Sequence, residues 1–191
     1  MTRGRLEAFS DAVIAILMTI MVLQLVLPRG ADWHALKKVL PVFLTYMLSY
    51  VNLGIYWNNH HHMLAATERI NGKILWANLH LLFWLSLFPF MTGWLGKFHS
   101  DPLPAAVYGV VLLLAAIAYY ILKTAIVSAH GPDSTLARAL GNDFKGKISP
   151  ALYAVAIPLA YVSSWISIGI YVLVALMWLV PDPRIESTLG T

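Results

Sequence analysis

The chain has 191 residues, of which 59% are hydrophobic and only 12% are charged, and its formal net charge at pH 7 is +4. A soluble domain needs a polar surface, and globular proteins carry about 25% charged residues to supply one. The composition therefore argues against a water-soluble enzyme, a nucleic-acid-binding module and a disordered chain, and it predicts a protein embedded in a lipid bilayer. Cysteine is absent, which excludes disulfides, haem thioethers and thiolate metal sites.

Six apolar stretches follow one another along the chain. Each is a candidate span, because a helix needs about 20 mostly apolar residues to cross about 30 Å of hydrocarbon. The last two stretches could form one long helix, which would leave five spans, but Ser163-Ser164 favours a tight turn between two short ones. We therefore predict an all-α, polytopic membrane protein with six transmembrane helices in a single domain, 1–191; the spans are about 8–27, 39–59, 74–95, 103–127, 149–163 and 165–180.

Lysine and arginine residues are distributed unevenly over the loops between these spans. If the N-terminus is cytoplasmic, nine of the basic residues lie on the cytoplasmic side and four lie outside. Since basic residues gather in cytoplasmic loops, this bias predicts that both termini are cytoplasmic. The two halves of the chain show no obvious similarity, so the sequence gives no support for an inverted-repeat transporter.

The first span combines an aliphatic stripe with an acidic residue. At 100° per residue, Ile16, Ile20 and Leu23 share one face of the helix, and Thr19 lies about 60° to its side. Asp11 lies about 140° from Ile16, so its carboxylate is expected to face neighbouring helices. A charge within a span costs about 2.5–3.5 kcal/mol to insert and is a functional candidate by default. The stripe itself fits either a pore lining or a lipid-facing surface, and the pattern alone leaves both open.

Histidines and asparagines gather near the ends of the second and third spans. The run His60-His61-His62 invites a metal site, but consecutive helical residues diverge by about 100° and no ligand follows one turn later. We therefore expect these histidines to form structural hydrogen bonds, with no metal and no cofactor. Asn78 and His80 face different ways and are expected to pack between helices. No spacing suggests a catalytic triad or a carboxylate pair, so we predict no enzymatic activity.

A short motif at the start of the first span points to a family. The sequence Arg5-x-x-x-Phe9-Ser10-Asp11, followed directly by an apolar span, resembles the signature of the transmembrane protein 175 family of potassium channels, and most closely its prokaryotic members. Their length and number of spans are also similar. Further similarity lies in the second and third spans, at Trp57 through His61, Asn78, Pro89-Phe90 and Thr92, so that the resemblance covers essentially the whole chain. Ala12 is a departure, since many prokaryotic members have Gly there.

The resemblance implies a homotetramer in a prokaryotic plasma (inner) membrane, with potassium ions passing along an axis lined by four first spans. Ile16 would match the narrowest hydrophobic constriction and Ile20 and Leu23 further aliphatic layers, while Thr19 would match a threonine layer for cation preference. It also implies that polar residues tie the pore helix to the second and third spans. These are Arg5, Ser10 and Asp11 of the signature, with Trp57, His61 and Asn78 as candidate partners.

A pore of this kind has a simple physical basis. Four isoleucines around an axis leave a gap that loses its water when narrow, which blocks ions without any charge. A small rotation of the helix would widen the gap and admit a partly hydrated cation with modest preference for potassium over sodium. Hydrogen bonding between Arg5 and Asp11 would fix that rotation. Two other hypotheses remain open: a proton-coupled or proton-conducting transporter that uses Asp11 and the histidines, and a membrane enzyme or assembly factor.

Overall fold

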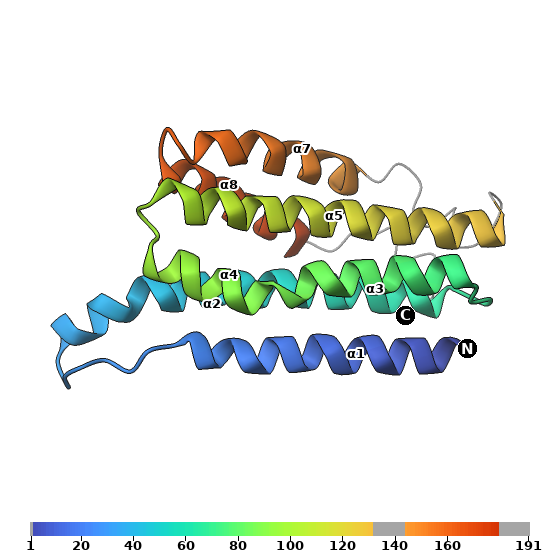
Figure 1. Cartoon of the computed structure of the whole chain (residues 1–191), viewed down its shortest axis with the longest axis horizontal. Helices are drawn as coiled ribbons and strands as arrows, with labels where there is room; N and C mark the ends of the chain where they lie inside the picture. Colours follow the sequence, from blue (N-terminus) through green and yellow to red (C-terminus); the bar gives the residue numbers. More distant parts are fainter. Residues whose placement is uncertain (1, 132–143, 180–191) are drawn as a thin grey trace.

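A computed structural model describes residues 2–131 and 144–179 of the chain (Figure 1). All regular elements within these two ranges are helical, as the hydropathy pattern predicts. In chain order they are α1 (Arg3–Ile20), the 3-10 helix η1 (Met21–Gln24), α2 (Trp33–Ala65), α3 (Gly72–Ser86), α4 (Phe88–Lys97), α5 (Pro102–His130), α7 (Phe144–Leu159) and α8 (Ser164–Leu179). The predicted all-α membrane fold is therefore confirmed.

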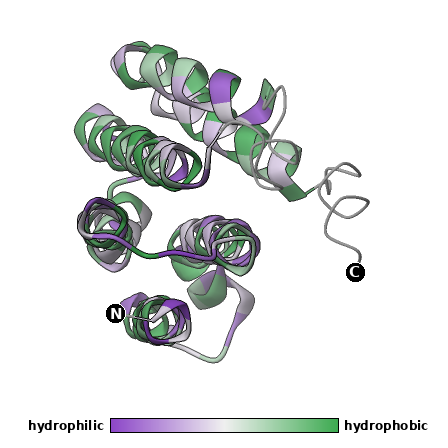
Figure 2. Cartoon of the chain, turned by 90° about the vertical axis from the view of Figure 1, so that its right-hand side faces the viewer, coloured by the Kyte–Doolittle hydropathy of each residue, from purple (hydrophilic) through white to green (hydrophobic). Residues whose placement is uncertain are grey.

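The helices stack in layers (Figures 1 and 2). Helix α1 lies at one edge of the bundle, followed by the layer of α2, α3 and α4, then by α5, with α7 and α8 at the opposite edge. The N-terminus, the loop between α2 and α3 and the C-terminal end of α5 share one end of the bundle, which we call the N-terminal end. Because α1 packs on its neighbours from one side only, its other side is left open in the single subunit.

Four helical segments among the described residues are long and apolar enough to cross a membrane: Arg3–Gln24, Trp33–Ala65, Gly72–Lys97 and Pro102–His130. Helices α7 and α8 have 16 residues each. At 1.5 Å per residue each is about 24 Å long, which is short of the hydrocarbon thickness. They are separate helices, because a turn over residues 160–163 divides them next to the expected Ser163-Ser164 position. The described residues therefore hold four candidate spans, as expected of a multi-pass membrane protein, and two shorter helices, α7 and α8.

The third pass, Gly72–Lys97, is one candidate span, as expected over 74–95, but its helix is interrupted at Leu87. Pro89 lacks a backbone N–H and sits in the first turn of α4, where helices tolerate proline. The Leu87 N–H bonds to the Trp84 carbonyl at 3.3 Å, a tighter three-residue turn, and α4 then restarts with the Met91 N–H on the Leu87 carbonyl. Proline thus converts one span into two helices that continue in roughly the same direction.

The first pass also differs from its predicted bounds. The helix begins at Arg3 rather than near residue 8, so the whole signature is helical, and η1 ends at Gln24 rather than at residue 27. Leu25 already has extended backbone angles (φ −74°, ψ 124°). Pro28 in turn disfavours helical backbone angles at Leu27, so the helix is not expected to reach residue 27. Helix α2, at 33 residues, is in turn longer than the expected 39–59.

Small residues on α5 let its neighbours approach closely. The buried small side chains of α5 are Ala105, Ala106, Gly109, Ala115 and Ala118. The phenol of Tyr171 on α8 crosses this surface at Gly109 and donates a hydrogen bond to the Ala105 carbonyl at 3.0 Å. A β-carbon at Gly109 would lie only 2.8 Å from the Tyr171 ring carbon Cζ. Gly109 is therefore required for the contact between α5 and α8.

We predict that Gly109→Ala destabilises the protein, because the added methyl group forces Tyr171 away from its hydrogen bond. Overpacking of this kind costs about 1–3 kcal/mol. Heating the detergent-solubilised protein and following the folded fraction by size-exclusion chromatography should show a lower melting temperature. Gly169→Ala on α8 is the matched control, because nothing lies within 4 Å of a β-carbon there. Equal melting temperatures for the two variants would contradict the packing role of Gly109.

Candidate ion-conduction surface and its polar support

Helix α1 has a buried face and an exposed face. The buried residues recur every three or four positions, at Leu6, Ser10, Ile14 and Leu17. This spacing places them along one side of the helix, against α2 and α3. Since α1 packs on its neighbours from one side, the residues between these positions stay uncovered in the single subunit.

The exposed face of α1 carries the aliphatic residues that the sequence singled out. Ile16 is 57% exposed, Ile20 38% and Leu23 77%. Thr19 is exposed beside them, and its hydroxyl donates to the Ile16 carbonyl at 2.8 Å. Because that bond uses the hydroxyl proton, the exposed Thr19 oxygen can still act as an acceptor. We refer to Ile16, Thr19, Ile20 and Leu23 as the aliphatic face.

On the opposite side, three fully buried polar side chains join α1, α2 and α3. The Asn78 amide donates to the Ser10 hydroxyl at 2.9 Å, and its carbonyl oxygen lies 2.7 Å from His60 Nε2. An amide oxygen only accepts hydrogen bonds, so His60 donates from Nε2. Ser10 in turn donates to the Leu6 carbonyl at 2.9 Å. We call Ser10, His60 and Asn78 the buried triad; each is 0% exposed.

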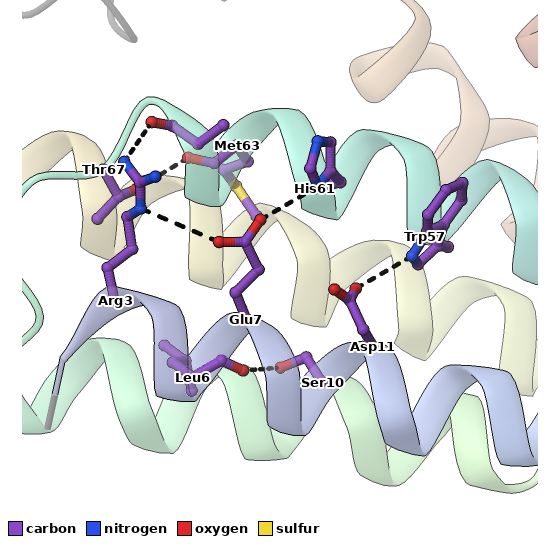
Figure 3. Close-up of polar contacts among 10 residues, drawn as sticks. Arg3, Leu6, Glu7, Ser10, Asp11, Trp57, His61, Met63 and Thr67 are labelled. Atoms are coloured by element: carbon purple, nitrogen blue, oxygen red, sulfur yellow. Dashed lines mark hydrogen bonds and ion pairs between the residues drawn. The ribbon is translucent and has the colours of Figure 1, made fainter.

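The signature aspartate is tied to α2. Trp57 Nε1 donates to an Asp11 carboxylate oxygen at 3.0 Å (Figure 3). Asp11 is half-buried and lies about 100° around α1 from Ser10, so Ser10 meets α3 while Asp11 meets α2. Arg5 is exposed, and the described donor to Asp11 is the Trp57 indole rather than Arg5. Of the two kinds of partner that the sequence analysis named for Asp11, the candidate Trp57 on α2 makes this contact and Arg5 does not.

A third group of contacts joins α1 to α2 at the N-terminal end of the bundle (Figure 3). Glu7 lies 3.1 Å from His61 Nδ1 and 4.0 Å from Arg3. Arg3 also donates to the Ala65 carbonyl at 2.9 Å, which satisfies an acceptor in the last turn of α2. These contacts are partly exposed, so each one contributes little by itself, typically about 0–1 kcal/mol. They fasten the end of α1 rather than its centre.

The structure brings most of the expected tethering residues together, though not all as expected. Ser10 meets Asn78 and Asp11 meets Trp57. His61 binds Glu7 rather than a signature residue, and Phe9 is 47% exposed.

The sequence analysis expected structural hydrogen bonds from the histidine run, as His60 makes, but it singled out neither His60 as the partner of Asn78 nor Glu7 as the partner of His61. A signal for His60 was present, because it stands four residues before the buried Leu64 and seven after the buried Leu53, on the same face of α2.

A second polar chain lies farther along the bundle, near the end of η1. The hydroxyls of Tyr108, Ser49 and Thr92 are bonded in series at 2.9 and 2.7 Å, and Thr92 also donates to the Phe88 carbonyl at 2.7 Å. All three side chains are buried and come from α5, α2 and α4. In hydrocarbon a hydroxyl needs such partners, so this chain fixes how the three helices meet.

The described part of the chain holds no cluster of three or more His, Cys, Asp or Glu side chains that could bind a metal ion. His60 and His61 bond to different helices, His60 to α3 and His61 to α1. This divergence follows from the 100° step between consecutive helical residues.

Four long apolar helices, with buried hydrogen bonds between them, define a multi-pass α-helical membrane protein. Comparisons with known proteins specify the family. A family model described as the endosomal/lysosomal potassium channel TMEM175 matches residues 5–89, the segment that holds α1, the buried triad and the aliphatic face.

Whole-length relatives agree with this match. The chain is 51% identical over 189 residues to a potassium channel of Chryseobacterium sp. (strain P1-3), covering 99% of this chain and 98% of the relative. It is 30% identical over 200 residues to a potassium channel of Streptomyces collinus, with 96% of each chain covered. The crystal structure of a lysosomal potassium-selective channel TMEM175 homolog from Chamaesiphon minutus superposes with a TM-score of 0.77 at 28% identity, covering 93% of this chain and 96% of that one. The chain therefore belongs to the TMEM175 family of ion channels, which is not a class of enzymes.

We predict that Asn78→Leu strongly impairs folding, because it leaves two fully buried groups, Ser10 and His60, without their partner. Each unsatisfied group costs about 1–3 kcal/mol. The yield of monodisperse protein and its melting temperature in detergent should both fall. Asn58→Leu, at an exposed position on α2, is the control and should stay close to wild type. If Asn78→Leu has the same melting temperature as Asn58→Leu, the buried triad does not hold α1.

We also predict that the histidine run binds no zinc. The neighbouring side chains diverge, and neither cysteine nor a third ligand stands beside them. Elemental analysis of tag-free protein, purified without chelators, should therefore find no stoichiometric zinc. One tightly held zinc ion per subunit would refute this prediction.

Proposed function

We propose that this chain forms a potassium-permeable channel in which four copies of α1 line the pathway and Ile16 forms its narrowest point. The observation that carries the proposal is the aliphatic face, whose three apolar residues remain 38–77% exposed in the single subunit. The family relationship supports potassium as the ion that is conducted, because two full-length relatives are named potassium channels. The proposed selectivity is potassium over sodium, and modest.

A homotetramer is the arrangement we propose for the subunits. Helix α1 lies at the edge of the bundle, so its aliphatic face can meet a symmetry axis only if other copies of the chain surround that axis (Figure 1). Closed cyclic symmetry then repeats Ile16 once per subunit at one level of the pathway. The ring of isoleucines would exclude water when narrow and admit a partly hydrated cation when α1 rotates.

The tethering contacts have a defined role in this proposal. The buried triad and the bond from Trp57 to Asp11 fix the rotation of α1, and the rotation decides which side chains meet the axis. The residues of the aliphatic face and those of the tethers lie on opposite sides of one helix. A change in the tethers would therefore alter conduction through rotation rather than by contact with the ion.

The membrane and the orientation are also part of the proposal. Nine of the thirteen Lys and Arg residues fall on the side of the N-terminus when the passes are counted, which favours a cytoplasmic location for both termini. The relatives named above are bacterial, which supports a prokaryotic plasma (inner) membrane.

We predict that Ile16→Asn and Ile16→Ala raise ion flux and reduce the discrimination between potassium and sodium. Asn keeps a similar size but binds water, whereas Ala widens the gap. Each 1.36 kcal/mol removed from the barrier raises the rate about tenfold, and four copies change together, so an increase of about tenfold or more is expected. Flux is measured in liposomes that hold a potassium or a sodium gradient, together with a proton-sensitive dye.

Ile117 supplies the matched control. It is an isoleucine on α5, 39% exposed, on a helix that does not carry the aliphatic face. Ile14 is unsuitable as a control despite pointing away from Ile16, because it is fully buried and its substitution would loosen the core. Unchanged flux in both Ile16 variants, or equal effects at Ile117, would overturn the pore assignment. Saturable flux with a fixed proton stoichiometry would instead favour a proton-coupled transporter.

A further inference from the structure

A shallow groove lies between α3 and α5 on the surface of the bundle, and it begins near the N-terminal end. Among its lining residues are Lys73, Trp76, Ala77 and His80 of α3 and Ile121 and Ala125 of α5. The described lining includes no residue of the aliphatic face or of the buried triad. The groove is therefore a feature that the proposed ion pathway does not use.

The shape of the groove follows from the sizes of its side chains. The four residues of α3 are spaced i, i+3, i+4 and i+7, which places them on one side of that helix. Ala77 is buried and Ala125 half-buried, whereas Trp76 is 75% exposed and Ile121 42%. The two alanines thus form the floor and the two bulky residues form the rims. The resulting groove is apolar and open to the surrounding lipid.

A positive charge stands at the outer end of the groove. Lys73 is the second residue of α3, so it lies where the third pass enters the membrane, at the level of the lipid headgroups. It is exposed, and it forms no ion pair within residues 2–131 and 144–179. Glu68 and Arg69, in the preceding loop, are exposed and carry opposite charges. The charge of Lys73 therefore remains, and it is complementary to an anionic headgroup.

A hydrogen-bond donor lies deeper in the groove. Trp84 Nε1 lies 2.9 Å from His80 Nε2, and because an indole N–H can only donate, this ring nitrogen is the acceptor. The proton of the neutral imidazole is therefore on Nδ1, which no hydrogen bond among the described residues uses. His80 stands seven residues after Lys73, about 10 Å farther along α3 at 1.5 Å per residue. This donor thus lies on the hydrocarbon side of the lysine.

We propose that the groove binds one anionic phospholipid from the leaflet at the N-terminal end of the bundle. The flexible side chain of Lys73 pairs with the phosphate, and the Nδ1–H of His80 donates to an ester carbonyl. The glycerol backbone lies between them, over Ala77 and Ala125, and an acyl chain continues past Ile121 into the bilayer.

The order of these groups is the reason for assigning a lipid. A phospholipid presents a charged phosphate at the surface, an ester carbonyl that only accepts hydrogen bonds below it, and an apolar chain below that. The groove presents a cation, a donor and an apolar wall in the same order. Basic sites between transmembrane helices hold anionic headgroups on this principle. The inference does not depend on the channel proposal, since no residue of the aliphatic face takes part.

The test is native mass spectrometry of the delipidated full-length protein in detergent, titrated with dioleoylphosphatidylglycerol or dioleoylphosphatidylcholine. Wild-type protein should bind the first phosphatidylglycerol more tightly than phosphatidylcholine. Lys73→Gln should weaken that binding by about fivefold, the contribution of one lysine near a membrane surface, and Lys73→Arg should restore it. Lys38→Gln is the matched control, because Lys38 is an exposed lysine near the start of α2, at the opposite end of the bundle (Figure 1).

The role of His80 has its own readout. An ether-linked phosphatidylglycerol lacks the ester carbonyl, so wild-type protein should bind it about fivefold more weakly than the ester lipid, as expected for the loss of one hydrogen bond. His80→Phe keeps a ring of similar shape without the donor, and it should bind the ester and ether lipids equally. A merely structural role of His80 would not change this ratio.

Ala125→Leu fills the floor of the groove and should reduce lipid binding without a change in charge. Equal binding of phosphatidylglycerol and phosphatidylcholine by wild type would overturn the proposal, as would equal losses in Lys73→Gln and Lys38→Gln. Displacement of the lipid by millimolar inorganic phosphate would reduce the site to one for phosphate alone. If Ala125→Leu binds lipid normally but no longer forms multimers, the groove is a contact between copies of the chain and the lipid assignment is wrong.

Discussion

The hydrogen bonds among Ser10, His60 and Asn78 are the constraint on which the rest of the α1 surface depends. These three side chains are fully buried in a protein whose surroundings offer no water, so each must find its partner on a neighbouring helix. Only one rotation of α1 brings Ser10 to Asn78. The same rotation turns Ile16, Ile20 and Leu23 outward, so one internal polar contact decides which residues are presented outside.

The contacts on α1 differ in strength along its length, and the difference has a physical cause. At the N-terminal end, Arg3, Glu7 and His61 are partly exposed, and their ion pairs are weakened by solvent. Near the middle, Ser10 is dry and its bonds cannot be exchanged for bonds to water. Asp11 lies between these conditions, half-buried and held by Trp57. The buried contacts in the middle of α1 therefore fix the rotation of the helix. The exposed contacts at its N-terminal end limit the fraying of the first turn.

Away from α1, the bundle is held by close packing supplemented with hydroxyl chains. Small residues on α5 admit Tyr171, whose phenol satisfies a backbone carbonyl of α5. The serial contact of Tyr108, Ser49 and Thr92 joins α5, α2 and α4 in the same manner. Packing and interhelical hydrogen bonds hold the helices together because lipid tails are as apolar as the helix surfaces, so the hydrophobic effect does not drive the helices to associate.

Sequence alone determined the helical class, the membrane environment and the two faces of α1. These properties follow from composition and from the 100° step of a helix, which are local. It also located the Ser163-Ser164 region as a turn. Tertiary structure decided that Asp11 meets Trp57 rather than Arg5, that His60 joins Asn78, and that His61 meets Glu7. Those outcomes depend on which helices become neighbours and at what rotation, and helix periodicity says nothing about either.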